Sequence, residues 1–538
     1  MAEDIVCEES VGDPGRRSRL NDAKEIQDIL KNNKGTDAIE GIILEFEILH
    51  LSTKSFQDMS NLRFLKIQSP RLKIGYDYDE DRAAIYFHPW FLNGLNSLSN
   101  KVRNFYWDEY PFEALPLGFC PEKLVEIHLR TSNIKKLWNG VQDLMNLKII
   151  NLSFSDKLKE LPDLSKACNL EILDLQCCSN LRSIHPSVLS LPKLVSLNLS
   201  HCFKLTNLHG ENHLKSLKHL KLSYCTRLKE FLLSSTEMRS LDLSATGIKT
   251  LNLPVDRFNK VEDLTLGQPL ESFQINQLSC LTSLKKFSLS YFRGVLEKSK
   301  LDILFDAWPS LEELHLTYCE VLEIPENISS LSLLKILSLR GNGIKSLPHS
   351  IKHLSELKQI DLRECRWLRT LPELPSSITH FYVSECTSLE TMDFTLMRAI
   401  HNNAGEVKVC YPGSTIPKGF KYCQTGKNSI TIELAPPSSS DQLLGFVCCC
   451  ILPAFRGFVD SSGFTICRKF HFEDDGINYK DEIEFPRLEN MKRDHVFVWY
   501  DPMEQILRGT QRRRYDEGTT SKFALSVGLT VVGTILMT

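Results

Sequence analysis

One eight-residue phrase recurs twelve times between Lys123 and Cys386, and it constrains the fold more than any other feature of the sequence. The phrase has apolar residues at its second, fifth and seventh positions, as in NLEILDLQ from Asn169 and KLVSLNLS from Lys193. The other copies begin at Lys123, Asn146, Ser216, Glu237, Lys260, Ser283, Ser310, Leu333, Glu356 and Ser377. Successive copies start 21 to 27 residues apart. Such regular spacing indicates a repeat protein, in which each unit stacks on its neighbours.

The L-x-L centre of the phrase predicts a short strand. On a strand the two apolar residues point to one side and the x residues to the other. One such strand cannot bury its apolar side alone, so neighbouring strands are expected to form a parallel sheet backed by the return segments. The period and the L-x-x-L-x-L phrase are those of leucine-rich repeats. The sequence therefore predicts an α/β leucine-rich-repeat solenoid with the parallel sheet on its concave face.

A small buried residue is predicted three positions after the last apolar residue of each phrase. Asn342 occupies this station once, and cysteine occupies it in six copies: Cys178, Cys202, Cys225, Cys319, Cys365 and Cys386. Leucine-rich repeats carry Asn or Cys here, turned inward at the end of the strand. We therefore expect these cysteines to pack in the core. Metal ligation or disulfide pairing is the alternative, and no metal or cofactor is expected.

Charge and the N-terminal sequence limit the compartment and the ligands. The net charge of −3 gives no argument for nucleic acid or an anionic membrane as partner. The first twenty residues lack the apolar run of a secretory signal, so we expect a cytoplasmic protein with reduced cysteines, the nucleus being the alternative. The basic cluster Arg16, Arg17 and Arg19 is either an import or nucleic-acid patch or an ordinary solvated surface. Downstream of it, Ala23 to Asn32 has helical apolar spacing, with Asp22 as its N-cap.

The N-terminal residues carry a family resemblance. The landmarks are Met1 to Val6, Glu9-Ser10, Pro14 to Leu20, Ile29-Leu30, Gly35-Thr36 and Ile39 to Ile42. They resemble the junction between nucleotide-binding domain and repeats in plant TIR-type nucleotide-binding leucine-rich-repeat disease-resistance proteins. In that family a methionine like Met1 lies just after the winged-helix motif, so this chain is expected to begin immediately downstream of it. Residues 41–122 resemble the irregular first repeats of the same proteins.

Beyond Cys386 the phrase stops and the pattern changes to strands and turns. Strands are expected at 407–409, 429–434, 443–452, near Ile466 and His471, and at 494–500. This segment resembles the post-repeat jelly-roll domain (C-JID) of the same receptors, through a motif made of Tyr411, Pro412, Gly413, Ser414, Ile416 and Pro417. It departs from the family at Gly419, where a tryptophan is usual, and after Phe523, where the usual basic, cysteine-containing ending is absent. The second part is therefore expected to be an all-β jelly-roll or sandwich, with an altered C-terminal edge.

These readings divide the chain into five parts. The predicted parts are a remnant of the winged-helix end (1–40), irregular first repeats (41–122), leucine-rich repeats (123–392), a spacer (393–406) and the post-repeat domain (407–538).

The first half of the tail from Phe523 to Thr538 alternates apolar with small or polar residues as far as Val531, which favours a strand. A membrane-spanning helix needs about 20 predominantly apolar residues, and this run is shorter and interrupted. We expect it to close the jelly-roll as an edge strand, a tail anchor or a disordered tail being the alternatives.

The sequence carries no catalytic signature. It contains no G-x-x-x-x-G-K-[ST] loop, no G-x-S-x-G elbow, no H-E-x-x-H and no paired C-x-x-C sites. In the resembling family, NAD cleavage belongs to the TIR domain and the ADP/ATP switch to the nucleotide-binding domain, and the resemblance implies that both lie upstream of the residues in this sequence. We therefore expect no enzyme activity.

The expected function is protein recognition. The resemblance implies the sensing part of an intracellular plant immune receptor, which detects a pathogen effector and restrains activation. It also implies association with full-length receptor chains. The alternative is a non-immune scaffold that joins host signalling proteins. Neither nucleic acid nor a membrane is expected as a partner.

The candidate partner-binding residues are the x residues of the predicted strands and the residues just after them. They form columns on the concave face, and the alternative is that they are simply a solvated polar surface. The candidates are Glu126, His128, Arg130, His219, Lys221, Glu313, His315, Arg340, Gln359, Asp361, Arg363, His380 and Tyr382.

Overall fold

The structure is a computed structural model of the whole chain. It describes residues 10, 12–45, 49, 51–69, 94–116, 118–208, 214–231, 233–253, 257–383, 385–389, 408–414, 429–434, 445–452, 464–472, 477–485, 494–502 and 521–530. The chain divides into two units, Met1–Leu284 and Lys285–Thr538.

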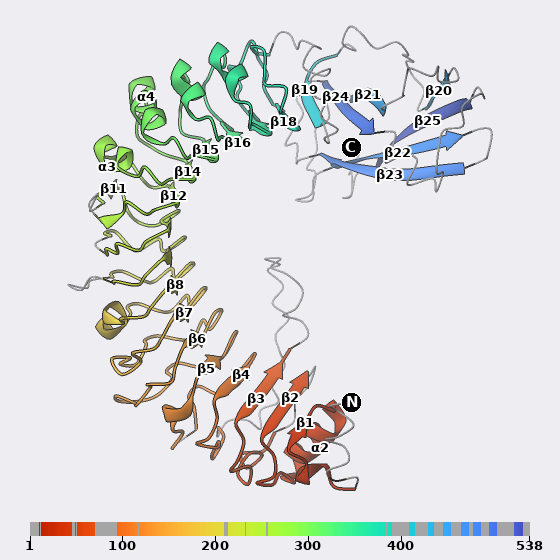
Figure 1. Cartoon of the computed structure of the whole chain (residues 1–538). Coiled ribbons are helices and arrows are strands. Elements are labelled where there is room, and N and C mark those ends of the chain that lie inside the picture. Colours follow the sequence, from red (N-terminus) through yellow and green to blue (C-terminus); the bar gives the residue numbers. More distant parts are fainter. Residues whose placement is uncertain are drawn as a thin grey trace, which may run out of the picture. The chain divides into compact units, whose positions relative to one another are not determined.

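Unit 1 is built on a parallel sheet whose strands follow one another in chain order (Figure 1). Its strands are β1 (Arg19–Leu20), β2 (Gly41–Glu45), β3 (Phe64–Gln68), β4 (Asn104–Trp107), β5 (Glu126–His128), β6 (Ile149–Asn151), β7 (Ile172–Asp174), β8 (Ser196–Asn198), β9 (His219–Lys221), β10 (Ser240–Asp242) and β12 (Asp263–Gly267). A separate parallel pair is formed by β11 (Thr250–Leu251) and β13 (Ser272–Phe273). The helices are α2 (Ala23–Asn32) and α3 (Ile275–Ser279), with 3-10 turns η1 (Pro14–Arg16), η4 (Pro121–Lys123) and η5 (Pro186–Ser190).

Unit 2 begins with a run of parallel strands and continues with antiparallel ones. The parallel strands are β14 (Lys286–Ser290), β15 (Glu313–Thr317), β16 (Ile336–Ser338), β17 (Gln359–Asp361) and β18 (His380–Tyr382). Their return segments contain α4 (Lys298–Ala307), η7 (Glu326–Ser330) and η8 (His349–His353). In Figure 1 α4 lies on the side of its repeat opposite the strands. Every copy of the repeated phrase thus contains a strand, which confirms the leucine-rich-repeat solenoid.

The post-repeat strands of unit 2 form two antiparallel sheets. One has the order β19 (Lys408–Pro412), β24 (His495–Pro502), β21 (Gly445–Leu452). The other has the order β20 (Ser429–Leu434), β25 (Ser521–Thr530), β22 (Phe464–Phe472), β23 (Ile477–Phe485). The all-β prediction is confirmed, and the jelly-roll topology stays a prediction. Sequence analysis did not single out β23.

The expected edge strand at the C-terminus is wrong in its position. Residues 521–530 are a strand, as expected, but β25 pairs with β20 on one side and β22 on the other. Alternation along a strand reports which residues share a face and says nothing of how many neighbours the strand has. Residues 531–538 lie outside the described residues, as do the predicted spacer 393–406 and motif residues Ile416 and Pro417.

The core of the repeats is a ladder of apolar residues in register. Ile150, Leu173 and Leu197 face one another on β6, β7 and β8, and each is fully buried. Burying one such side chain contributes about 1.5–3 kcal/mol, so the ladder is the main source of stability. The predicted helix is confirmed as α2, and Asp22 caps it by accepting hydrogen bonds from the N–H groups of Lys24 and Glu25. Strand β1 pairs with β2, so the two sides of the predicted domain boundary near residue 40 belong to one sheet. The boundary itself stays a prediction.

The inward cysteine station is confirmed. Cys178 Sγ donates to Leu152 O at 3.2 Å, and Cys365 Sγ donates to Leu339 O at 3.1 Å. Each bond gives a hydrogen-bond donor to a buried backbone carbonyl at the end of the preceding repeat's strand. All six station cysteines are buried and unpaired by disulfides. Burial raises the pKa of the Cys225, Cys319 and Cys365 thiols to about 12. These side chains are structural hydrogen-bond donors.

Candidate functional site

The largest group of predicted site residues lies on strands β15 to β18 of unit 2. Parallel register places Glu313, Gln359 and His380 in one row with Ile336. A second row contains His315, Ser338, Asp361 and Tyr382. We call these rows, with Arg340 and Arg363 that follow them, the open sheet face. The structure thus brings together all of the predicted site residues of this unit's repeats.

Arg340 is the centre of a cation–aromatic–carboxylate cluster. Its guanidinium donates to Glu364 Oε1 from Nη2 at 2.5 Å and from Nε at 3.0 Å. The same guanidinium lies 5.8 Å from the centre of the Tyr318 ring. Burial pushes the pKa of Glu364 upward, but hydrogen bonds from Tyr318 and Arg340 outweigh it and hold that pKa below its ordinary value. Burial, and then the bond to Glu364, raise the pKa of Tyr318 to about 12. At neutral pH the cluster is one cation, one anion and one neutral phenol.

Arg363 forms a second, similar cluster in the next repeat. It donates to Asp361 from Nε at 2.9 Å and from Nη2 at 2.7 Å, and its guanidinium lies 5.4 Å from the Tyr382 ring centre. Asp361 is only 5% exposed and also accepts from the Arg363 backbone N–H. Both of its oxygens hold Arg363 and the strand end, and the role of Asp361 in partner binding stays a prediction. Arg363 and Tyr382 remain half-buried and reachable.

Glu313 and His315 form a smaller polar group on β15. Glu313 accepts from Lys286 on β14 at 3.0 Å and lies 3.4 Å from His315 Nε2. Burial raises the pKa of Glu313, but its bonds to Lys286 and His315 outweigh burial and lower it overall. Gln359 and His380 are half-buried farther along the row of Glu313, beyond Ile336. The face therefore presents polar groups of both signs.

The residue that precedes the inward station was not among the predicted site residues. In unit 2 these residues are Tyr291, Tyr318, Gly341, Glu364 and Glu385, and each has a positive φ between 52° and 72°. Two of these residues, Tyr291 and Tyr318, stack with ring centres 4.8 Å apart. The signal available in the sequence was the position itself, since four of the five residues directly precede Cys or Asn at the station and Tyr291 precedes Phe292 there.

In unit 1 the predicted residues fall into two separate places. Glu126 accepts a short hydrogen bond from the Tyr106 hydroxyl and lies 3.3 Å from His128 Nε2, and the Tyr106 and His128 rings stack at 4.4 Å. Burial lowers the pKa of His128, which keeps the imidazole neutral at pH 7. Arg130 binds Asp108 through two bonds of 2.9 Å.

His219 and Lys221 lie on β9, away from that cluster. Three strands separate β9 from β5, so the structure does not bring the two groups together. The row between them contains Asn151, Asp174 and Asn198, which sequence analysis did not select. Each of these side chains accepts a hydrogen bond from the backbone N–H two residues on, at 3.0 to 3.1 Å. They close the turn after the strand, so their role is structural.

The post-repeat motif is described only in part. Tyr411 on β19 pairs with Val496 on β24, and burial raises its pKa. The Gly413 N–H donates to Asp494 O at 2.8 Å. A Cβ on Gly413 would lie 3.0 Å from Val496 Cγ2, so glycine allows the segment after β19 to approach β24 closely. Pro412 ends β19 and exposed Ser414 follows Gly413. These described residues hold a strand end in place.

Neither a metal site nor a membrane span is present in the described part of the chain. Among those residues no group of three or more His, Cys, Asp or Glu side chains could hold a metal ion. Within the same residues, none of the helices has the length and apolar character needed to cross a membrane.

Comparisons with known proteins match both parts of the chain. The leucine rich repeat family matches residues 123–142 and 309–366, and the C-JID domain matches residues 411–529. Disease resistance protein RPS6 of Arabidopsis thaliana is 28% identical over 536 residues, which cover 90% of this chain and 46% of that protein. TMV resistance protein N of Nicotiana glutinosa is 28% identical over 426 residues, covering 69% of this chain and 36% of that protein. The chain spans less than half the length of these curated relatives.

Among solved structures, the LRR protein LIC12759 of Leptospira interrogans is 18% identical, with a TM-score of 0.41. The match covers 69% of this chain and 90% of that one. At that score the likeness carries no further argument.

Proposed function

This chain belongs to the plant disease resistance proteins that join leucine-rich repeats to a C-JID domain, and we propose that it is the protein-recognition module of an intracellular immune receptor. The TIR-type resemblance identified from the sequence is confirmed by these matches. The observation that carries the proposal is the shared order of repeats and C-JID domain. Effector sensing and restraint of activation are the specific activities we propose for it.

The open sheet face is the surface we propose for partner binding. Arg340, Arg363, Tyr318 and Tyr382 combine cationic and aromatic groups, the residue types that dominate binding energy in protein interfaces. Each guanidinium is held by a carboxylate and lies over a ring, so little side-chain entropy is lost when a partner binds. The partner is a protein, either a pathogen effector or a host signalling protein.

Three further properties form part of this proposal. The matches cover repeat and C-JID regions, and we propose that the chain has no catalytic activity of its own. We also propose that it resides in the cytoplasm or nucleus and associates with full-length receptor chains. Purified chain should then leave NAD and ATP unchanged, and a fluorescent fusion should report the compartment.

The test is a double charge reversal, Arg340→Glu with Arg363→Glu, on the full chain. Binding to a panel of secreted pathogen proteins and host signalling proteins is measured by co-immunoprecipitation from leaf tissue. We expect the amount of effector that co-precipitates with the chain to fall at least tenfold, while the denaturation midpoint of the chain shifts little. The matched control reverses Lys335 and Lys352, which form exposed pairs with Glu312 and Glu373 in the same unit.

Two outcomes would contradict the proposal. If the double reversal leaves binding intact and lowers only stability, the two clusters are structural. If the chain captures host signalling proteins and no effector, the scaffold function replaces the immune one.

A further inference from the structure

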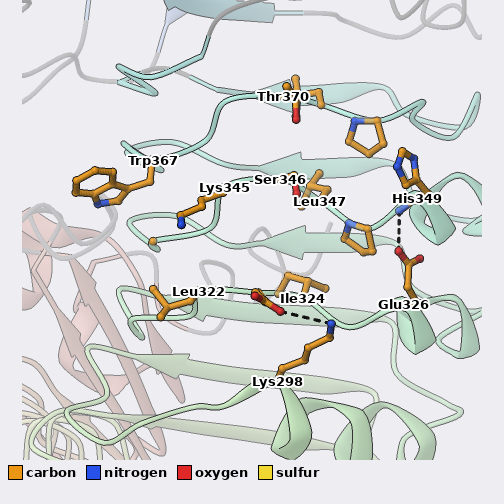
Figure 2. A pocket seen from close by; sticks show the side chains of 15 residues that line it. Lys298, Leu322, Ile324, Glu326, Lys345, Ser346, Leu347, His349, Trp367 and Thr370 are labelled. Atoms are coloured by element: carbon orange, nitrogen blue, oxygen red, sulfur yellow. Dashed lines mark hydrogen bonds and ion pairs between the residues drawn. The ribbon is translucent and has the colours of Figure 1, made fainter.

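A groove of about 860 Å³ crosses three consecutive repeats of unit 2 (Figure 2). Its walls come from the segments that follow β15, β16 and β17, and α4 contributes Lys298. None of the predicted site residues lines it. It is therefore a surface distinct from the open sheet face.

Two large apolar side chains in this groove are unusually exposed. Leu322 is 67% exposed and Trp367 is 63% exposed, and both line the groove. Exposing one large apolar side chain is ordinary, but two bordering one groove mark a site for a partner. Tryptophan is also the residue most enriched where binding energy concentrates.

Gly343 keeps the space beside Leu322 open. A Cβ at this position would lie 2.8 Å from Leu322 Cδ2. The φ of Gly343 is not in the left-handed region, so backbone conformation does not require glycine here. Glycine is therefore favoured here because a side chain would collide with Leu322. The corresponding turn of the next repeat contains Trp367.

Among the charged side chains that line the groove, Lys345 is the one with neither an ion pair nor a hydrogen bond within the described residues. Lys298 pairs with Glu323 at 3.4 Å. Glu326 accepts the backbone N–H groups of His349 and Ser350 at 3.3 and 2.9 Å. The exposed Lys345 side chain has no hydrogen bond or ion pair to any residue that the structure describes. In Figure 2 it lies between Trp367 and Leu322.

We propose that this groove binds an extended acidic–apolar peptide segment of another protein. A large apolar side chain of the segment packs between Leu322 and Trp367, and an adjacent carboxylate pairs with Lys345. Strands about 4.8 Å apart make three repeats roughly 10 Å wide, which is the span of about three extended residues. The charge complementarity sets the preference for acidic sequences.

The test pans a random octapeptide display library on the full chain and on three variants. We expect enriched peptides to carry Asp or Glu next to a large apolar residue. The Kd of a fluorescein-labelled synthetic copy of the most enriched peptide should rise at least tenfold with Trp367→Ala and with Gly343→Leu. Panning on Lys345→Glu should instead select Lys or Arg beside the apolar residue. All three positions are at least partly exposed, and denaturation midpoints confirm that each variant folds.

Matched controls are Leu333→Ala, which removes another exposed apolar side chain, and Lys358→Glu, which reverses another exposed lysine outside the groove. Both should bind the peptide as the unchanged chain does. Failure to enrich any peptide, or enrichment unaffected by Trp367→Ala and Lys345→Glu, overturns the proposal. Concentration-dependent self-association abolished by Trp367→Ala would assign the groove to a second copy of this chain, which also overturns it.

Discussion

The ring of Tyr318 lies directly against the backbone of Gly341, so that a Cβ built on Gly341 would overlap the ring. Gly341 also has a φ of +72°. The left-handed backbone favours glycine at this turn but also accepts Tyr318 and Glu364 in neighbouring repeats, so the ring of Tyr318 is the constraint particular to Gly341.

Replacing Gly341 by alanine should destabilise the chain by about 2–3 kcal/mol, combining left-handed strain with the clash. In a Tyr318→Ala background the same substitution should cost only about 1–2 kcal/mol, since the strain alone remains. Denaturant midpoints of the four proteins in this cycle give the comparison. Equal costs in both backgrounds would show that the ring does not constrain Gly341.

The inward station should tolerate serine but not alanine at Cys365. Cys365→Ala leaves the buried Leu339 carbonyl without its donor, at a cost of about 1–3 kcal/mol. Cys365→Ser keeps a donor, as Ser155 does when it donates to Leu129 O of the preceding repeat at 2.9 Å. The readout is the denaturation midpoint, and an equal loss for both substitutions would mean that sulfur packing outweighs the hydrogen bond.

Thiol alkylation should separate structural from surface cysteines. With a pKa of about 12, the Cys225, Cys319 and Cys365 thiols hold almost no thiolate at pH 8, and they are also buried. Exposed Cys120 and Cys280 should react with iodoacetamide, and the buried three should react only after denaturation. Mass spectrometry of the digested protein counts the adducts. Comparable native labelling of both sets would contradict the burial.

The Arg340–Glu364 pair should stabilise the fold in a pH-dependent way. The pKa of Glu364 is lowered in the folded state, so its contribution is present above the unfolded value near 4.5 and lost as pH falls through the folded value. Arg340→Gln should therefore lower stability at pH 7, by less than about 1 kcal/mol because the pair is partly solvated, and have less effect at pH 3. Lys352→Gln, whose partner Glu373 is 78% exposed, should show almost no effect at either pH. The same Arg340→Gln deficit at both pH values would argue against an ionic origin.

Truncation after Lys522 should disrupt the whole second sheet of the post-repeat region. Strand β25 pairs with both β20 and β22, so its loss leaves β20 without a partner and exposes one edge of β22, which keeps only β23. Unpaired strand edges promote aggregation, and we expect reduced solubility and rapid proteolysis within residues 408–485. A chain ending at Thr530 is the control, because it keeps every residue of β25. Wild-type solubility of the shorter chain would contradict a central β25.

The sequence by itself determined the repeats, the apolar ladder and the cysteine station. These follow from alternation and period, since a residue's place in the phrase decides which side of its strand it occupies. Helix α2 and its Asp22 cap were predictable for the same local reason.

Only the tertiary structure decided which side chains meet. Arg340 finds Glu364 and Tyr318, 24 and 22 residues away along the chain, because parallel register sets whole repeats side by side. Asp361 was selected from the pattern as a partner-binding residue, and the structure shows that it is buried and accepts hydrogen bonds from Arg363. The interior place of β25 is likewise a matter of strand order. Lateral contacts depend on what the neighbouring repeat or strand carries, and local periodicity contains no information about that neighbour.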